Sequence, residues 1–269
     1  MASTSGRVSG AESGRKLLAV LLSFDGSHPR WNLSQLSEEL QLSSSSTYRY
    51  MSLLREVGLL EPLGGGGFRL TERVLALAAA ARADHEPLLA AAHPVMVRLR
   101  DAFDETVLLA RRGGMHVYCM DRVESRQPVR LQYERGQAMP LHLGSLARIL
   151  LASMPRADRD SYLESVAGVL TAHQSRLLTE GALDRVLKDG QTQSSQEIDD
   201  GIWGTAAAVR DGRGVVASLG TAAPMYRLDE ARKRSISARV SHGALEVSAA
   251  LEPSLDPSAT ASYGATEEP

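Results

Sequence analysis

The stretch from residue 33 to residue 70 restricts the possible folds more than any other part of the chain. Apolar residues recur every third or fourth position over residues 33–40 and again over residues 47–58, which predicts two short helices. Ser34 is the expected N-cap of the first helix, and Gly58 stands where a glycine ends many helices. The four serines at residues 43–46 lead directly into the second pattern, so we expect them to open the second helix.

The residues on either side of this helix pair complete a small domain. An apolar helical face over residues 15–24 ends at Asp25-Gly26, and residues 59–63 and 68–71 resemble two short strands joined by glycines. Three helices followed by a hairpin predict a winged helix-turn-helix over residues 14–70. An alanine-rich linker helix is expected over residues 71–84, with Thr71 as its cap.

The remainder, residues 85–251, alternates between helical and strand-like patterns. Helices are expected at residues 93–103, 143–152, 159–169, 183–188 and 229–251, and strands at residues 105–110, 115–120, 127–132, 201–210 and 215–220. This mixed order predicts the α+β class, with a central antiparallel sheet in the second domain. Residues 1–13 and 252–269 lack a hydrophobic period and are expected to be disordered tails.

The charge of the whole chain argues at first against a nucleic-acid partner. Its 269 residues carry 30 Lys+Arg and 32 Asp+Glu, a net charge of −2. The balance differs by region, because residues 1–83 hold nine basic and seven acidic residues and the rest hold 21 and 25. The first domain is therefore slightly basic, and a dimer would double its phosphate contacts.

Motifs for catalysis, metal binding or membrane insertion are missing from the sequence. A single cysteine, Cys119, excludes an intramolecular disulfide and a thiolate zinc site. The seven histidines show no HExxH spacing, and no GxSxG nucleophile elbow occurs. We therefore expect no catalytic residue, no metal and no cofactor. No apolar run reaches the roughly 18 to 20 residues that span a bilayer, and the N-terminus lacks the core of a signal peptide, so we expect a cytoplasmic protein without a membrane partner.

The second helix of the pair has the residues for reading DNA. In a helix-turn-helix the N-terminal residues of this helix meet base edges in the major groove. Hydroxyls and a guanidinium on its outer face suit phosphate and base contacts, and a hairpin arginine could reach a minor groove or a phosphate. The predicted DNA-binding residues are Ser43, Ser44, Ser45, Ser46, Tyr48, Arg49, Ser52 and Arg69.

Two other interpretations of this region stay open. The serines could form a plain loop, with a winged helix that serves protein contacts only. The glycines at residues 64–67 could form a phosphate-binding loop, although no Lys-Ser or Lys-Thr follows them and no helix begins there.

On these residues the chain resembles the IclR-type bacterial transcriptional regulators, from about Arg15 to Leu251. The first domain carries the resemblance over residues 33–78. The second carries it at Gly136-Gln137-Ala138-Met139-Pro140-Leu141-His142, Leu150-Leu151-Ala152, Glu197, Gly201, Ala206-Ala207, Val209, Asp211, Gly214 and Val215-Val216-Ala217. Two stretches depart from the pattern: the family usually has a small-residue stretch and Gly-Lys where this chain has Leu143-Gly144-Ser145-Leu146-Ala147-Arg148, and Ala-Ala-Pro-Val where it has Ala206-Ala207-Ala208-Val209.

The resemblance implies a homodimer formed through the DNA-binding domains, often assembled to a tetramer, on double-stranded operator DNA. It also implies a C-terminal domain similar to GAF and PAS sensors, which holds a small organic acid, sometimes an aromatic one. We expect a ligand-responsive regulator, and a repressor rather than an activator, whose effector changes operator binding through oligomer geometry. A small-molecule sensor or interaction protein without DNA binding is the alternative, and an enzyme acting on a small acid is a third class.

Transferred by position, the resemblance places the effector against Leu131, Met139, Leu143, Gly144, Ser145, Leu146, Ser194, Ile202, Gly204 and Gly220. Physical arguments support part of this set. Residues 144 and 145 begin a helix whose free N–H groups favour a carboxylate, and strand alternation puts residues 202 and 204 on the face opposite Trp203. Since two glycines remove side-chain volume, we expect a roomy pocket suited to an aromatic ring bearing a carboxylate. The open alternative is that both glycines serve bulges or close packing.

Overall fold

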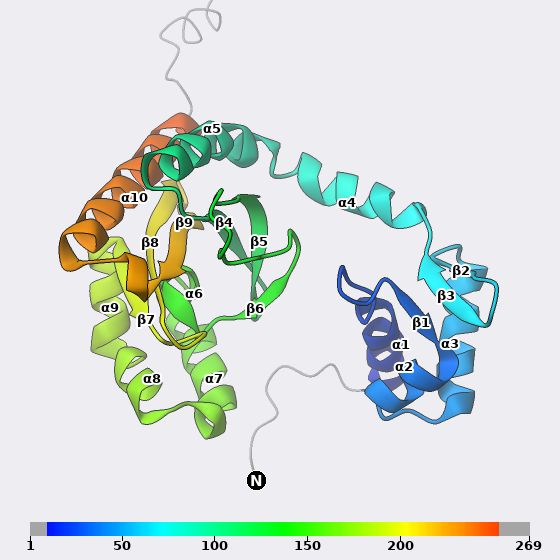
Figure 1. The fold of residues 1–269 in the computed structure, drawn as a ribbon. Helices are drawn as coiled ribbons and strands as arrows, with labels where there is room; N and C mark the ends of the chain where they lie inside the picture. The colour runs from blue at the N-terminus through cyan, green and yellow to red at the C-terminus, as the bar shows by residue number, and fades with distance from the viewer. Residues whose placement is uncertain (1–9, 253–269) are drawn as a thin grey trace, which may run out of the picture. The chain divides into compact units, whose positions relative to one another are not determined.

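The computed structural model describes residues 10–252, which fall into two compact units divided between Glu86 and Pro87. Most of the two expected tails, residues 1–9 and 253–269, lies outside the described residues. The end of the first expected tail is structured, because helix α1 already begins at Glu12. The mixture of helices and antiparallel strands confirms the predicted α+β class (Figure 1).

The first unit is a winged helix-turn-helix followed by one further helix. Its elements are α1 (Glu12–Leu22), β1 (Arg30–Asn32), α2 (Leu33–Glu39), α3 (Ser44–Glu56), β2 (Leu60–Pro62), β3 (Gly67–Leu70) and α4 (Arg73–Ala83). The three strands form an antiparallel sheet with β3 in the middle. Strand β1 was not predicted, because three residues are too few to show an alternating pattern.

The apolar stripes of the three N-terminal helices meet in one small core. Val20 of α1, Leu36 of α2 and Met51 of α3 are buried together with Leu60 of the wing. The second helix is capped by Asn32 rather than by the expected Ser34, since the Asn32 side chain accepts a hydrogen bond from the backbone of Gln35. The Gln35 side chain returns one to the backbone of Asn32, which makes a capping box.

The second unit is built on a six-stranded antiparallel sheet with the order β6-β5-β4-β9-β8-β7. Its strands are β4 (Val107–Gly113), β5 (His116–Val123), β6 (Ala138–Pro140), β7 (Gln191–Ser195), β8 (Ile202–Asp211) and β9 (Gly214–Pro224). Its helices are α5 (Glu86–Phe103), α6 (Gly144–Ala152), α7 (Arg156–Val166), α8 (Ala172–Leu177), α9 (Glu180–Asp189) and α10 (Glu230–Leu251), with short 3₁₀ turns at Ala167–Val169 and Met225–Arg227.

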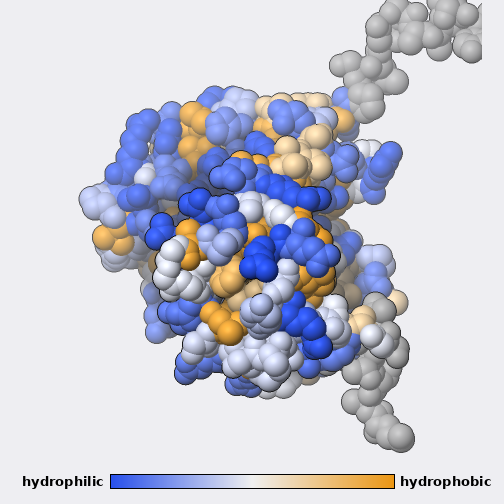
Figure 2. All heavy atoms as spheres, turned by 90° about the vertical axis from the view of Figure 1, so that its right-hand side faces the viewer, coloured by the Kyte–Doolittle hydropathy of each residue, from blue (hydrophilic) through white to orange (hydrophobic). Residues whose placement is uncertain are grey.

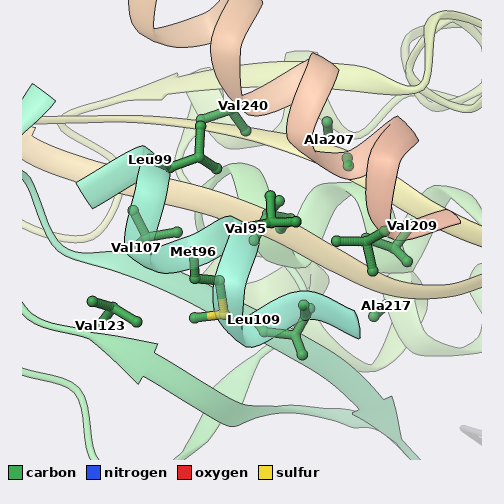
Figure 3. Packing of buried hydrophobic residues seen from close by; sticks show 14 of the residues in the cluster. Val95, Met96, Leu99, Val107, Leu109, Val123, Ala207, Val209, Ala217 and Val240 are labelled. Carbon is green, nitrogen blue, oxygen red and sulfur yellow. The ribbon is translucent and has the colours of Figure 1, made fainter. Parts of the chain in front are cut away.

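Helices cover both faces of this sheet. On one face, Val95, Met96 and Leu99 of α5 and Val240 of α10 pack against strand residues such as Leu109 (Figure 3). Trp203 is buried in the same cluster. On the other face α6 lies across β8, β9 and β4 (Figure 1). Successive residues of β8 therefore alternate between a tightly packed core and the face that carries α6, as the sequence predicted for Trp203.

Several predicted elements of the second unit were wrong. Residues 127–132 form no strand, because their carbonyl groups bond to side chains: Thr106 donates to Leu131 and Arg227 donates to Val129. The strand beside β5 is β6 instead. Helix α5 begins at Glu86 rather than at residue 93, since its buried face continues on the N-terminal side of Pro94. Helix α8 and strand β7 were not predicted.

The junction between α5 and β4 contains a buried carboxyl group. Glu105 is 1% exposed, and its Oε2 accepts a hydrogen bond from Arg227 at 3.0 Å. Its other oxygen has no hydrogen-bond partner among the described residues. Burial raises the pKa of Glu105 from an ordinary 4.5 to about 7, although Arg227 and Arg232 act in the opposite direction. The folded protein therefore holds a proton on Glu105 more tightly than the unfolded chain does.

This raised pKa predicts that Glu105 contributes a pH-dependent part of the stability, which Glu105→Gln removes. Below pH 4.5 Glu105 is protonated in both the folded and the unfolded state, and between pH 4.5 and about 7 only the folded state keeps the proton. The stabilising contribution of this proton to the protein is therefore lost as pH rises through this window. Urea unfolding measures the effect: from pH 5 to pH 8 the free energy of unfolding of the wild type should fall by about 1 to 3 kcal/mol relative to that of the variant.

The comparison between variant and wild type is needed because His142 acts with the opposite sign. Burial lowers the pKa of His142 from 6.5, so its contribution to stability is lost as pH falls. A stability difference between the two proteins that stays constant from pH 5 to pH 8 would show that Arg227 keeps Glu105 ionised.

Candidate functional site

Helix α3 presents two chemically different faces. Thr47, Tyr50, Met51 and Leu54 are buried against the core of the first unit. The opposite face is exposed and polar at Ser44, Ser45, Tyr48 and Arg49, with Ser52 half-buried beside it. The exposed Arg49 guanidinium lies 5.7 Å from the centre of the Tyr50 ring, an attractive cation–π arrangement. The predicted set of hydroxyls and one guanidinium thus gathers on one side of the helix.

Two of the predicted serines also have a structural task. Ser43 is the N-cap of α3, and its Oγ accepts a hydrogen bond from the backbone N–H of Ser46 at 3.3 Å. The same hydroxyl donates to Ser46 Oγ at 2.9 Å. At the other end of the helix Gly58 has a positive φ of 73°, which confirms its expected role in ending α3. Ser43 and Ser46 therefore order the start of the helix, Ser45 Oγ lies 3.2 Å from Ser43 Oγ, and Ser44 is exposed beside them.

The wing carries its charges on the sheet face that points away from the core. Arg69 donates from Nε to Glu61 Oε1 at 2.5 Å, so the charge of the predicted wing arginine is matched within the hairpin. Arg30 of β1 stands directly opposite Arg69 in the register and is exposed. Sequence reasoning missed Arg30, because β1 itself was not recognised.

The second unit contains a small cavity between the N-terminus of α6 and the sheet. Ser194, Gly204 and Ala222 lie side by side on β7, β8 and β9 and form part of its floor. The cavity has a volume of about 30 Å³. Its walls are Leu108, Val117, Tyr133, Met139, Leu143, Gly144, Ser145, Leu146, Ala147, Ser194, Glu197, Ile198, Ile202, Gly204, Thr221 and Ala222.

Eight of the ten residues predicted to contact an effector line this cavity, and Leu131 and Gly220 do not. Leu131 lies in the irregular segment described above. Gly220 is a packing glycine, since a Cβ there would lie 2.5 Å from the carbonyl oxygen of Thr205 and 3.0 Å from Leu146. Gly204 does belong to the cavity, where a Cβ would lie 2.9 Å from Ser194 Oγ and 3.2 Å from Ser145 Oγ.

A carboxylate of the protein itself occupies the N-terminus of α6. Glu197 accepts a hydrogen bond from the backbone N–H of Gly144 at 3.3 Å and pairs with Arg148, and both charged side chains are buried. Arg148 also donates to the carbonyl oxygen of Gln193 at 2.9 Å. The position expected for an effector carboxylate is thus already partly used. Neither Arg148 nor Glu197 was among the predicted site residues, although Glu197 was part of the family pattern.

The expectation of a roomy pocket was wrong, because neighbouring side chains occupy the space that the two glycines leave: Ser194 and Ser145 beside Gly204, and Ala206 and Leu146 beside Gly220. A volume of about 30 Å³ holds only one or two water molecules. Ile198 lies against Gly144, and Tyr133 adds to the wall from the segment before β6. Burial raises the pKa of Tyr133, so its hydroxyl stays protonated. The remaining polar groups of the wall are the hydroxyls of Ser145, Ser194 and Thr221.

Other candidate groups have structural surroundings. Cys119 is buried in β5, and burial raises the pKa of its thiol to about 11. His142 contacts the hydroxyl of Tyr162 at 2.7 Å, and this hydroxyl also accepts from the backbone of Leu141. Within residues 10–252, no group of three His, Cys, Asp or Glu side chains could hold a metal ion. In the same range no helix has the length and apolar character needed to cross a membrane.

Comparison with known proteins gives two family matches along the chain. Residues 15–64 match the model of the IclR helix-turn-helix domain. Residues 80–249 match the model of the C-terminal domain of the bacterial transcriptional regulator IclR.

Individual relatives agree with these matches. The chain is 28% identical over 226 residues to the HTH-type transcriptional regulator KipR of Bacillus subtilis, covering 82% of this chain and 89% of KipR. It is 24% identical over 255 residues to the acetate operon repressor of Salmonella typhimurium, covering 93% and 92%. An IclR homolog from Microbacterium hydrocarbonoxydans, crystallised in complex with 4-hydroxybenzoate, has the same fold with a TM-score of 0.68, at 22% identity and with 89% and 98% coverage.

The buried pair of Arg148 and Glu197 predicts a large loss of stability when one partner is removed. Glu197→Ala leaves the Arg148 guanidinium buried without a counter-charge and frees the Gly144 N–H, so the free energy of unfolding should fall by about 3 to 5 kcal/mol. Denaturant unfolding of the full chain measures this change.

A matched control exists on the surface of the same unit. Arg98 and Glu246 form an ion pair at 2.6 Å whose side chains are 59% and 43% exposed. Because solvent screens that pair, Glu246→Ala should cost no more than about 1 kcal/mol. Equal losses in the two variants would mean that the Arg148–Glu197 pair is solvated and does not hold α6.

Proposed function

Because the chain belongs to the IclR family of bacterial transcriptional regulators, we propose that it is a repressor that binds operator DNA through α3 and responds to a small organic acid held in the second unit. The observation that carries the DNA-binding half is the two-faced character of α3. Its buried face fixes the helix on the first unit, and its outer face offers Ser44, Ser45, Tyr48 and Arg49 to a major groove. The repressive mode is supported by the presence of a named repressor among the relatives.

Under this proposal the effector pocket is the cavity at the start of α6. Its walls are mostly apolar, and two hydroxyls, Ser145 and Ser194, converge beside Gly204. Such a site suits an aromatic ring with a hydrogen-bonding group directed to the two serines. The Microbacterium hydrocarbonoxydans homolog binds 4-hydroxybenzoate, and we propose an aromatic acid of similar size for this chain.

We also propose that the chain acts as a dimer formed through the first unit, and as a tetramer built from two such dimers. Helix α4 carries the argument, because only its two arginines are polar and yet none of its residues is buried. Leu75 and Leu77 are 64% and 60% exposed, and Leu22 of α1 is 77% exposed. A helix that is apolar on all sides requires a partner. Figure 2 shows hydrophobic residues at the surface among polar ones.

Arg49→Ala tests the assignment of the DNA-reading face. Loss of one base or phosphate contact should weaken binding to a fragment of the protein's own promoter by about 10-fold to 100-fold. Fluorescence anisotropy at several salt concentrations between about 50 and 200 mM should also show a shallower salt dependence if the contact is to a phosphate.

The matched control is Arg55→Ala, which removes an exposed arginine from the last turn of the same helix. It should leave operator binding nearly unchanged, because the N-terminal part of α3 enters the groove. If Arg49→Ala lowered ligand affinity and left DNA binding intact, the roles of the two units would have to be reversed.

Replacing both α4 leucines with glutamate tests the dimer. The double variant Leu75→Glu/Leu77→Glu should have the molar mass of a monomer in light scattering. It should also bind operator DNA at least about tenfold more weakly, since each copy would then bind one half-site alone. The fold should survive, because neither side chain is buried in the chain.

Val169→Glu, at another exposed aliphatic residue, is the control and should leave the oligomer intact. A double variant that stays dimeric would show that the exposed surface of α4 does not form the interface.

A further inference from the structure

The loop between β7 and β8 borders the cavity and is held firmly at both ends. At its start the backbone N–H of Gln196 donates to the carbonyl oxygen of Ile202 at 2.7 Å. At its end Met225 donates to the carbonyl oxygen of Gly201, also at 2.7 Å. Gln196 and Gly201 both have positive φ angles, 55° and 72°, which turn the chain sharply at either side. The residues between them are therefore presented in a fixed position.

Within this loop Glu197 and Ile198 have opposite characters. Glu197 is anchored in the interior by Arg148 and by the N–H of Gly144. The neighbouring Ile198 is 46% exposed, and it lines the cavity at the same time. Among the apolar side chains of the cavity wall it is the most exposed, because the others are buried or half-buried. Ile198 is thus the wall residue that gives up the least burial when it moves.

The contact between Ile198 and α6 is very close. A Cβ placed on Gly144 would lie 2.7 Å from Ile198 Cδ1, and Gly144 adopts a φ of 83° that other residues rarely take. The isoleucine therefore packs directly on the backbone at the first residue of α6. No side chain larger than hydrogen at position 144 leaves room for it.

We propose that Ile198 sets which ligands the cavity accepts, by filling the place of the ligand's apolar body and turning out to solvent when a ligand enters. This inference rests on the proposed effector role of the cavity. A space of about 30 Å³ cannot hold a ring unless a wall residue moves. The Glu197 anchor keeps the loop backbone in place, so the movement is a change of the Ile198 side-chain rotamer and not an opening of the loop.

The charges around the cavity indicate which chemical class fits. The Arg148 and Glu197 charges neutralise each other, and the first N–H of α6 is already used. A ligand therefore meets hydroxyls rather than an unpaired cation at the polar end of the cavity, where Ser145 and Ser194 converge. The class of ligand is a single aromatic ring that directs a hydroxyl or carboxyl group to the two serine hydroxyls, and the apolar contacts dominate recognition.

Calorimetric titration of the full chain with 4-hydroxybenzoate and with 6-hydroxy-2-naphthoate tests this role. Ile198→Ala removes the side chain that must move, so it should bind 4-hydroxybenzoate roughly tenfold more tightly than the wild type and accept the two-ring compound as well. Ile198→Trp should abolish binding of both. Val169→Ala truncates another exposed aliphatic residue of the same unit and should leave both affinities unchanged.

Thermal melts of the three variants establish that each is folded, which is expected because both replaced side chains are exposed. Weaker or unchanged binding by Ile198→Ala, or binding retained by Ile198→Trp, overturns the role of Ile198. If neither compound binds any variant, including Ile198→Ala, the effector assignment of the cavity falls together with this inference. The DNA-binding half of the proposed function would then still stand or fall on Arg49→Ala alone.

Discussion

The ion pair between Arg148 and Glu197 is the interaction on which the geometry of the second unit's site depends. It joins α6 to the loop after β7, and the same guanidinium reaches the backbone of β7 at Gln193. Burying two charges is costly, and the pair is tolerated because further hydrogen bonds surround it. Its consequence is a fixed start for α6, which in turn fixes Ser145 against Gly204 and leaves a narrow apolar space beside it. The ion pair thus fixes the frame of the cavity, and the wall side chains set its volume.

Elements whose signals are local were predictable from the sequence, and elements that depend on distant partners were not. Helix α3, helix α10 and the hairpin between β8 and β9 carry their own periodicity, caps and glycine turns. Strand β7 has the sequence QTQSS, with no apolar residue, and β6 has three residues, so neither shows an alternating pattern. These strands exist because β8 and β5 offer them backbone hydrogen bonds at the sheet edges. The same reasoning explains residues 127–132. Their composition allowed a strand, but the carbonyl groups of Leu131 and Val129 accept hydrogen bonds from the side chains of Thr106 and Arg227.

The candidate cavity was predictable in its framework and not in its volume. Ser194, Ile202 and Gly204 face it because of strand alternation and register, which a sequence can indicate. Ile198 and Tyr133 come from irregular segments, and no periodic rule says where such side chains point. Gly220 was wrongly assigned to the cavity for a different reason: a sequence does not distinguish a glycine that leaves room for a ligand from a glycine that permits close packing. The distances to Thr205 and Leu146 decide for close packing.

The charge distribution and the apolar surface of the first unit lead to one requirement. The unit has a small excess of positive charge, and the pairing of Arg69 with Glu61 reduces what the wing can offer to phosphates. A single copy would therefore have weak electrostatic attraction for DNA.

The same unit leaves α4 apolar and uncovered, which favours association of two copies. Association doubles the phosphate contacts and sets the spacing of two reading helices. Under the proposed function, an effector would act on such an assembly only through a difference in affinity between arrangements of the copies. Helix α5 lies in the same apolar core as Trp203 of β8, the strand that forms the cavity floor, and continues in sequence from α4. It is therefore the element through which we expect that difference to be transmitted.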